Sequence, residues 1–242
     1  MTTYNAPEQR YEEDRKNIKG IAMPYALVFL YLALGLGIVA GVGFGWPYLM
    51  SLTGNPTSML ISLVVAWIGI VVFSLIIGFK AFAKRSVAVL ICYLLDSFCW
   101  GIALSSTIGF VTENFSDGAA TVGIAFGVTA GIFLLMGLFG FIFKNAWKVS
   151  FILPFFLFGI MVMLLINMFA MKETVYWITD FVFFGVIMLE TMVDFNRIKR
   201  LADNGFINSA NNLAVYAAYT LLSDYVILLI RILPYLVISR RN

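Results

Sequence analysis

Seven long apolar stretches constrain the fold of this chain more than any other feature. They cover approximately Ile21–Leu49, Ser58–Phe79, Ser86–Val111, Ala119–Phe143, Val149–Met171, Val175–Phe195 and Asn212–Ile238. Each is long enough to cross a bilayer as a helix, which takes about 20 residues. The sequence therefore predicts an all-α membrane protein, a bundle of seven transmembrane helices. Because the link between the second and third stretches is short and basic, one long broken helix is an alternative there.

The remainder of the sequence leaves little room for a soluble domain. The chain is 62% hydrophobic and 12% charged, whereas a soluble domain is nearer half apolar and a quarter charged. We expect a polar N-terminal arm on the cytoplasmic side, residues 1–20, followed by one membrane domain, residues 21–242. We expect no cleavable signal peptide, because the first apolar stretch starts too late and is too long.

Lysine and arginine placement predicts the orientation, because these residues concentrate in cytoplasmic loops. Twelve of the 16 fall in the N-terminal arm and in the links after the second, fourth and sixth stretches. We therefore expect a cytoplasmic N-terminus and an external C-terminus. An alternative has six spans and a re-entrant last segment, which would place Arg240 and Arg241 inside. Compact loops and the lack of an organelle signal favour a bacterial plasma membrane.

The residue types present exclude several kinds of chemistry. The chain has no histidine, which removes histidine-based acid–base catalysis and imidazole ligation of metals or haem. Cys92 and Cys99 are seven residues apart in an apolar stretch, a spacing typical of neither a redox motif nor a zinc site. We interpret them as small buried residues, and we expect neither enzyme activity nor a cofactor.

Acidic residues inside the apolar stretches are the main functional signal. A carboxylate deep in a membrane helix is costly unless it is paired, protonated or hydrated. Asp194 and Asp224 lie in the sixth and seventh stretches, and Glu190 is four residues before Asp194, on the same helical face. Asp96 lies about ten residues into the third stretch. Asp180 is near the outer end of the sixth, where it could reach the membrane surface, so we give it no role.

Asp194 and Asp224 fall on consecutive segments, so antiparallel helices could bring both carboxylates into one pocket. Two carboxylates in a poorly solvated pocket cannot both ionise cheaply, so they would share a proton. Their oxygens also suit Ca²⁺, and protons and Ca²⁺ would compete for them. Lys84, Arg85 and Arg197 lie on the side from which a cation could lock the pair. An interhelical hydrogen bond that only fixes packing explains the spacing equally well.

Three motifs carry a resemblance to a known family. Asp-Phe-Asn-Arg-Ile-Lys at 194–199 is similar to the Asp-x-x-x-Ile-Lys end of the sixth span in the transmembrane Bax inhibitor motif family. Leu-Leu-Ser-Asp-Tyr-Val-Ile-Leu-Leu at 221–229 resembles its final-span signature, Leu-Tyr-Leu-Asp-Phe-Ile-Asn-Leu-Phe. Asp-Ser-Phe-Cys-Trp-Gly at 96–101 resembles the Glu-x-x-x-x-Gly of its third span. Seven spans and a charged N-terminal arm fit as well, so the resemblance covers essentially the whole chain.

The resemblance implies a helical bundle whose C-terminal helix is central, wrapped by the other six, and a Ca²⁺ leak gated by pH. Asp194 and Asp224 would form the sensing pair that binds protons and Ca²⁺, closed when they share a proton and open when both are charged. Asp96 and Glu190 are further candidates for lining a pore. The arginine latch of some members falls at Ala83 here, beside Lys84 and Arg85. Pro234 is a candidate break in the last helix.

Other functions fit parts of this pattern. A non-transporting membrane regulator that binds another membrane protein, in stress or protease regulation, is the main alternative. An intramembrane aspartyl protease also needs two aspartates on adjacent helices, but the Gly-x-Gly-Asp and Pro-Ala-Leu motifs are missing. A secondary transporter would be expected to show internal repeats. The sequence thus favours a pH-sensitive Ca²⁺ leak channel whose partners are the bilayer, Ca²⁺ and protons, with no nucleic acid.

Overall fold

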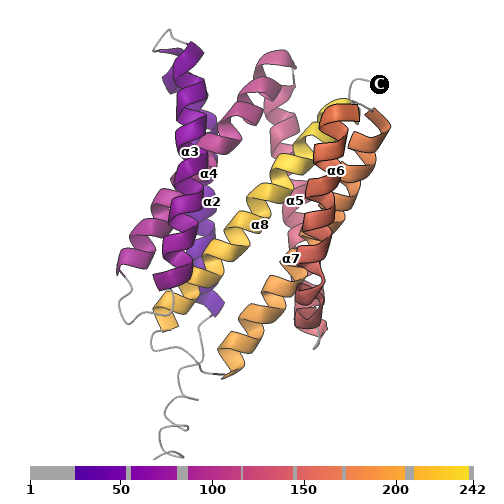
Figure 1. Ribbon diagram of the computed structural model, residues 1–242. Coiled ribbons are helices and arrows are strands. Elements are labelled where there is room, and N and C mark those ends of the chain that lie inside the picture. Colours follow the sequence, from indigo (N-terminus) through magenta and orange to yellow (C-terminus); the bar gives the residue numbers. More distant parts are fainter. Residues whose placement is uncertain are drawn as a thin grey trace, which may run out of the picture.

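The computed structural model describes residues 25–52, 56–80, 87–115, 117–143, 146–170, 173–204 and 210–239, which are helical almost throughout (Figure 1). The helices are α2 (Tyr25–Ser51), α3 (Pro56–Lys80), α4 (Val87–Asn114), α5 (Gly118–Ile142), the 3-10 helix η1 (Ala146–Phe151), α6 (Leu153–Ala170), α7 (Glu173–Asn204) and α8 (Ala210–Ser239). Among these described residues there are seven α-helices and no strand. The predicted all-α bundle is confirmed, and each helix matches one of the predicted stretches.

Five of the helices are long and apolar enough to cross a membrane: α2, α3, α4, α5 and α8. The remaining two differ for identifiable reasons. Helix α6 has 18 residues and runs into side chains outside the described set, and α7 carries several charged residues. Both run alongside the other helices in the same bundle (Figure 1). We therefore treat the chain as an integral membrane protein whose described residues form seven α-helices, five of which qualify as membrane spans.

Helix α8 occupies the centre of the bundle. It packs against α2, α4, α5 and α7, and it runs obliquely between α2–α4 on one side and α5–α7 on the other (Figure 1). Of its most apolar window, 67% is buried, against 17% for α3. The predicted central position of the C-terminal helix is thus confirmed. Four helices make its main contacts, while α3 packs on α4 and α6 packs on α7 as an outer layer.

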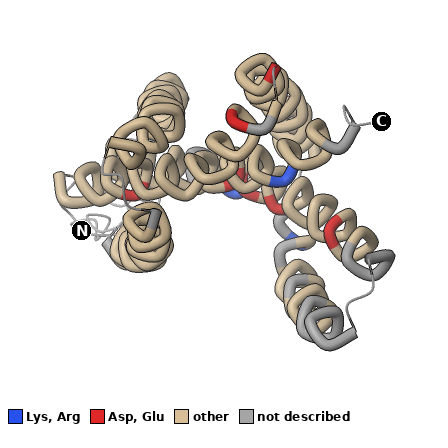
Figure 2. Tube along the Cα trace, turned by 90° about the horizontal axis from the view of Figure 1, so that it is seen from above, with Lys and Arg blue, Asp and Glu red and all other residues tan. Residues whose placement is uncertain are grey.

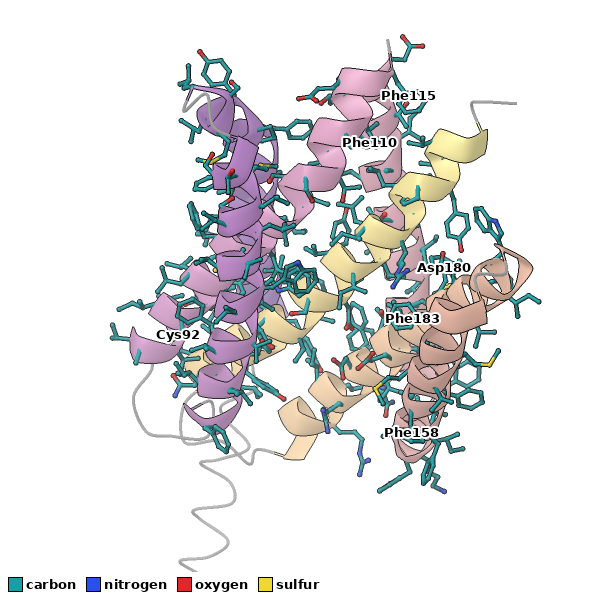
Figure 3. The ribbon with its side chains drawn as sticks, turned by 45° about the horizontal axis from the view of Figure 1, so that its top comes forward. Cys92, Phe110, Phe115, Phe158, Asp180 and Phe183 are labelled. Carbon is teal, nitrogen blue, oxygen red and sulfur yellow. The ribbon has the colours of Figure 1, made fainter. Side chains whose placement is uncertain are left out.

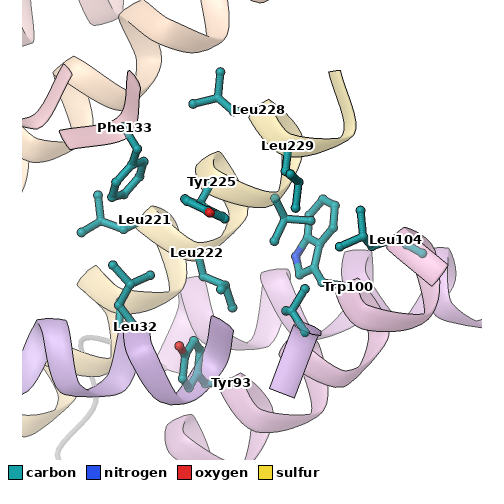
Figure 4. Close-up of a cluster of buried hydrophobic side chains, with 14 of the residues drawn as sticks. Leu32, Tyr93, Trp100, Leu104, Phe133, Leu221, Leu222, Tyr225, Leu228 and Leu229 are labelled. Carbon is teal, nitrogen blue, oxygen red and sulfur yellow. The ribbon is translucent and has the colours of Figure 1, made fainter. Parts of the chain in front are cut away.

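The core forms around the apolar side chains of α8 (Figure 4). Leu221 faces Phe133 of α5, and Leu222 lies toward Tyr93 of α4. The side chains of Leu221, Leu222 and Tyr93 are each at most 1% exposed. Trp100 of α4 fills the space further along α8 and is 4% exposed. Helix α8 combines these apolar side chains with polar ones such as Asp224 and Arg231, and polar side chains of membrane helices face the bundle interior. The exposed leucines, valines and isoleucines of α3 instead suit contact with lipid.

Helix α7 continues beyond its apolar stretch to Asn204, because hydropathy marks the apolar part of a helix and not its end. The candidate break in the last helix is wrong. Helix α8 is not broken at Pro234 and continues to Ser239. A proline removes one backbone hydrogen bond, and membrane helices tolerate this where neighbours support the backbone.

The alternative topologies also fail. Helix α8 is one continuous helix of 30 residues, about 45 Å long at 1.5 Å per residue, so the last segment is not re-entrant. Helices α3 and α4 are separate and pack against each other, so they do not form one broken helix. The N-terminal arm (residues 1–20) and the basic link with Ala83, Lys84 and Arg85 lie outside the described residues.

Candidate ion site between helices α7 and α8

A close approach of α5 and α7 positions the 194–199 motif. A Cβ atom on Gly140 of α5 would lie 2.5 Å from the backbone oxygen of Met192, so only glycine allows this spacing. The ring of Phe195 fills the adjacent space, with its centroid 5.1 Å from that of Phe133. Small residues allow membrane helices to approach this closely. The glycines of α5 therefore fix where the motif sits.

Two polar residues of the motif then bind the end of α5. The Asn196 side chain donates hydrogen bonds to the backbone oxygens of Gly140 (3.0 Å) and Phe143 (2.8 Å). Lys199 donates to the oxygen of Phe141 (3.0 Å). The last carbonyls of a helix lack partners within the helix, and these bonds supply them. Asp194 is two positions before Asn196, and residues two apart do not share a helical face. Its carboxyl is therefore left for α8.

Asp224 of α8 meets this part of α7. Its side chain is 6% exposed, and one carboxyl oxygen, Oδ2, is buried without a hydrogen-bond partner. The carboxyls of Asp194 and Glu190 lie close enough to act on Asp224 electrostatically, and Thr191 is within hydrogen-bonding reach. The structure thus brings together Asp194, Glu190 and Asp224, as the sequence predicted for the first and the last.

A buried carboxyl group with an unpartnered oxygen is costly in a membrane interior, and its charged form is the costlier one. Two further carboxyls nearby add like-charge repulsion. A bound proton, a bound cation or water would each lower the cost of burying the Asp224 carboxyl. The same carboxyl oxygens can therefore bind either a proton or a cation.

Of the three basic residues predicted to lock the aspartate pair, the structure describes only Arg197. Arg197 is exposed and acts on Asp194 electrostatically, but within the described part of the chain the two side chains form no ion pair. Lys84 and Arg85 lie outside the described residues. In the described ranges, no three His, Cys, Asp or Glu side chains lie close enough together to hold a metal ion by themselves. Any Ca²⁺ here would complete its six to eight oxygen ligands with hydroxyls, carbonyls and water.

Asp96 belongs to a different part of the core. It is 0% exposed on α4, and the indole N–H of Trp100 lies close enough to interact with its carboxyl, although the two do not meet the geometry of a full hydrogen bond. Its electrostatic neighbours are Tyr93, Cys99 and Tyr219, and it is not among the charges that act on Asp224. The structure therefore does not bring Asp96 into the Asp194–Asp224 cluster.

A second polar cluster joins α7 and α8, and sequence reasoning missed it. Asp180 of α7, to which we gave no role, forms an ion pair with Arg231 of α8. Its other oxygen accepts a hydrogen bond from Tyr235 (2.5 Å). Figure 3 shows Asp180 and Phe183 on the part of α7 that lies beside α8. The sequence did hold a signal for this pair, because opposite charges lie at similar depths in two consecutive apolar stretches. Asp180 lies five residues after Val175, where the sixth stretch begins, and Arg231 lies seven residues before Ile238, where the seventh ends.

Viewed from above, several acidic and basic positions of the described segments lie near the middle of the molecule, while other acidic positions lie on the outer helices (Figure 2). A membrane protein that keeps charge in its interior does so at substrate or ion pathways, or at sites of tight helix association.

The comparison with known families agrees with the motifs. The sequence profile described as inhibitor of apoptosis-promoting Bax1 matches residues 25–241. The chain belongs to this family. Among curated proteins, no sequence matches closely enough to name as a relative.

The region that matches the Bax1 inhibitor family includes all seven described α-helices, since it begins at the start of α2 and ends two residues after α8. It includes each of the three motifs that suggested the resemblance. The Bax1 inhibitor fold therefore places Asp194 and Asp224 on its last two helices, with the second of them at its centre.

Proposed function

We propose that this Bax inhibitor-like protein is a pH-sensitive Ca²⁺ leak channel, gated where α7 meets α8 by Asp194 and Asp224. One observation carries the proposal: Asp224 is buried with an unpartnered oxygen while the carboxyls of Asp194 and Glu190 act on it from α7. The site offers hard oxygen ligands without histidine or thiolate, which suits Ca²⁺ more than a transition metal.

The gate works through a shared proton. With one proton between them, the two aspartates are joined across the helices, and the α7–α8 contact is closed. When that proton is lost, two negative charges face each other in a poorly solvated site, and their repulsion separates the helices. Ca²⁺ then occupies the same oxygens as cargo. The leak is therefore low in acid and rises with pH.

The support of α7 favours movement on the α8 side. Asn196 and Lys199 hold α7 on the end of α5 through three hydrogen bonds to backbone oxygens. Phe195 packs between α5 and α7. Asp194 thus sits on a firmly held helix, so repulsion acts mainly on the contact with α8. Glu190 adds negative charge on the same face and would attract cations to the pair.

Ca²⁺ flux into dye-loaded proteoliposomes tests this function. Wild-type protein should leak more Ca²⁺ as the pH rises from about 6 to about 8, the range on either side of neutrality. Asp194→Asn and Asp224→Asn should each abolish that dependence. Asp117→Asn is the matched control, because Asp117 is exposed and makes no side-chain cap bond to α5.

Wild-type flux no greater than that of empty liposomes, with folded protein confirmed, would contradict the proposal. It would favour the alternative of a regulator that binds another membrane protein. The lysine and arginine distribution supports a cytoplasmic N-terminus and an external C-terminus, and the compact loops favour a bacterial plasma membrane. The proposed function involves no enzyme activity, no cofactor and no nucleic acid.

A further inference from the structure

Asp180, Arg231 and Tyr235 lie further along the same helix pair as the proposed gate. Arg231 follows Asp224 by seven residues and Asp180 precedes Asp194 by 14. Seven residues make about two turns of an α-helix and 14 make about four. Asp224 and Arg231 therefore share one face of α8, and Asp180 and Asp194 share one face of α7. Along α8, Arg231 is about 10 Å beyond Asp224 toward the C-terminus. We call these three residues the C-terminal cluster.

The cluster ties the beginning of α7 to the end of α8 by several bonds. Asp180 uses both oxygens, one for Arg231 Nη1 and one for the Tyr235 hydroxyl. The Arg231 guanidinium also lies 4.4 Å from the centroid of the Phe183 ring. The Tyr235 ring contacts those of Trp177 and Phe184, with centroids 5.8 Å and 6.5 Å apart. Every one of these contacts crosses from α7 to α8.

The charge of the cluster is suited to control cations. Asp180 is 12% exposed and Arg231 is 32% exposed, so the carboxylate is largely buried and the guanidinium balances its charge. With the pair formed, its two charges neutralise each other and the ends of α7 and α8 are joined, so this end of the helix pair is closed to a cation that leaves Asp224. When the pair separates, the helix ends come apart and a cation can pass. The closed state therefore depends on the tie between the helices, to which both partners contribute.

We propose that Asp180, Arg231 and Tyr235 form a second gate in series with Asp194 and Asp224, one that cations can pass only when the ion pair opens. This inference rests on the proposed channel function. It predicts that breaking the pair from either side has the same effect, because the closed state needs both partners.

The test measures Ca²⁺ flux at the pH where wild-type leak is largest. Asp180→Asn and Arg231→Gln should each raise the leak several-fold. The exchange of charges in Asp180→Arg with Arg231→Asp should bring it back toward the wild-type value. A simple repulsive charge at Arg231 would instead give opposite changes, higher flux for Arg231→Gln and lower flux for Asp180→Asn. Opposite changes, or unchanged flux in both variants, would overturn the gate.

A second readout does not depend on flux. In a background with Cys92→Ala and Cys99→Ala, a disulfide between Trp177→Cys and Tyr235→Cys would join α7 to α8 at the cluster. This background loses the Tyr235 hydrogen bond and keeps the Asp180–Arg231 pair, which is the part under test. Adding Asp180→Asn should slow this cross-linking several-fold, because the helix ends separate more often. An equal rate with and without Asp180→Asn would overturn the gate, even for variants whose flux is hard to measure.

The two proposals fail in distinguishable ways. If wild-type protein carries no Ca²⁺, the channel function is wrong and the gate falls with it. If wild-type protein carries Ca²⁺ with a pH dependence that needs Asp194 and Asp224, but the cluster variants behave as wild type, only the second gate is wrong. Loss of flux in the oxidised cross-linked protein, restored by a reducing agent, would support the gate directly.

Discussion

At the scale of single residues, neighbouring positions of one motif have separate tasks. In the 194–199 motif, Asn196 and Lys199 bind carbonyls of α5, while the Asp194 carboxyl acts electrostatically on Asp224 of α8. The motif thus combines a support for α7 with a charged group that the support presents to α8. The acids likewise differ by partner: Asp180 binds Arg231 and Tyr235, whereas the Asp96 carboxyl lies near the indole N–H of Trp100.

Asn196→Ala should separate support from sensing. The change removes both side-chain hydrogen bonds to α5 and leaves the oxygens of Gly140 and Phe143 without them. Unfolding should become easier by about 1–3 kcal/mol, the cost of leaving buried polar groups unpaired. Thermal unfolding in detergent measures this. The pH dependence of Ca²⁺ flux should remain, since both aspartates are intact, and its loss would show that Asn196 takes part in sensing.

At the scale of helices, packing depends on a few points of very close approach. Gly140 is one, because α7 backbone occupies the space where a side chain would begin. Gly127 lies on the same helix, but no atom lies within 4 Å of the position its Cβ would take. These two glycines of α5 form a matched pair of positions, one at a helix contact and one away from it.

Gly140→Ala and Gly127→Ala should therefore change stability in opposite directions. The first forces α5 and α7 apart and should destabilise the protein by about 1–3 kcal/mol, as overpacking does. The second only replaces glycine by a better helix former and should stabilise it by about 0.5–1 kcal/mol. Thermal unfolding of both variants in one detergent is the measurement. Equal effects at both positions would show that α5 and α7 are not packed as described.

At the scale of the whole molecule, the sequence predicts the number and place of the helices, because hydropathy alone marks apolar spans. It also predicts that Asp194 and Asp224 meet, because consecutive helices joined by a short turn are neighbours. It could not predict the Asp180–Arg231 pair in the same way, since an isolated acid near a span end fits equally well at the membrane surface. Hydropathy alone does not mark the end of α7, because Arg197, Lys199 and Arg200 are still helical beyond the apolar stretch.

The central position of α8 determines which helices carry the charged residues of the interior. It carries Asp224, Arg231 and Tyr235, while α7 supplies a partner for each. The other face of α8 packs on α2 and α4, where Asp96 lies. The α7–α8 contact is therefore where buried charge is concentrated, and it is the place where separation of two helices would open a polar path.

The central claim is that Asp194 and Asp224 act as one proton-sharing unit, and a double-mutant comparison tests it most directly. Ca²⁺ flux into proteoliposomes is measured against pH for Asp194→Asn, Asp224→Asn and the variant with both changes. Groups that act as a unit have non-additive effects. We expect the same flat pH profile from all three, since either single change already removes proton sharing. A partial pH dependence in each single variant, with a further loss in the double variant, would show two independent groups and contradict the account.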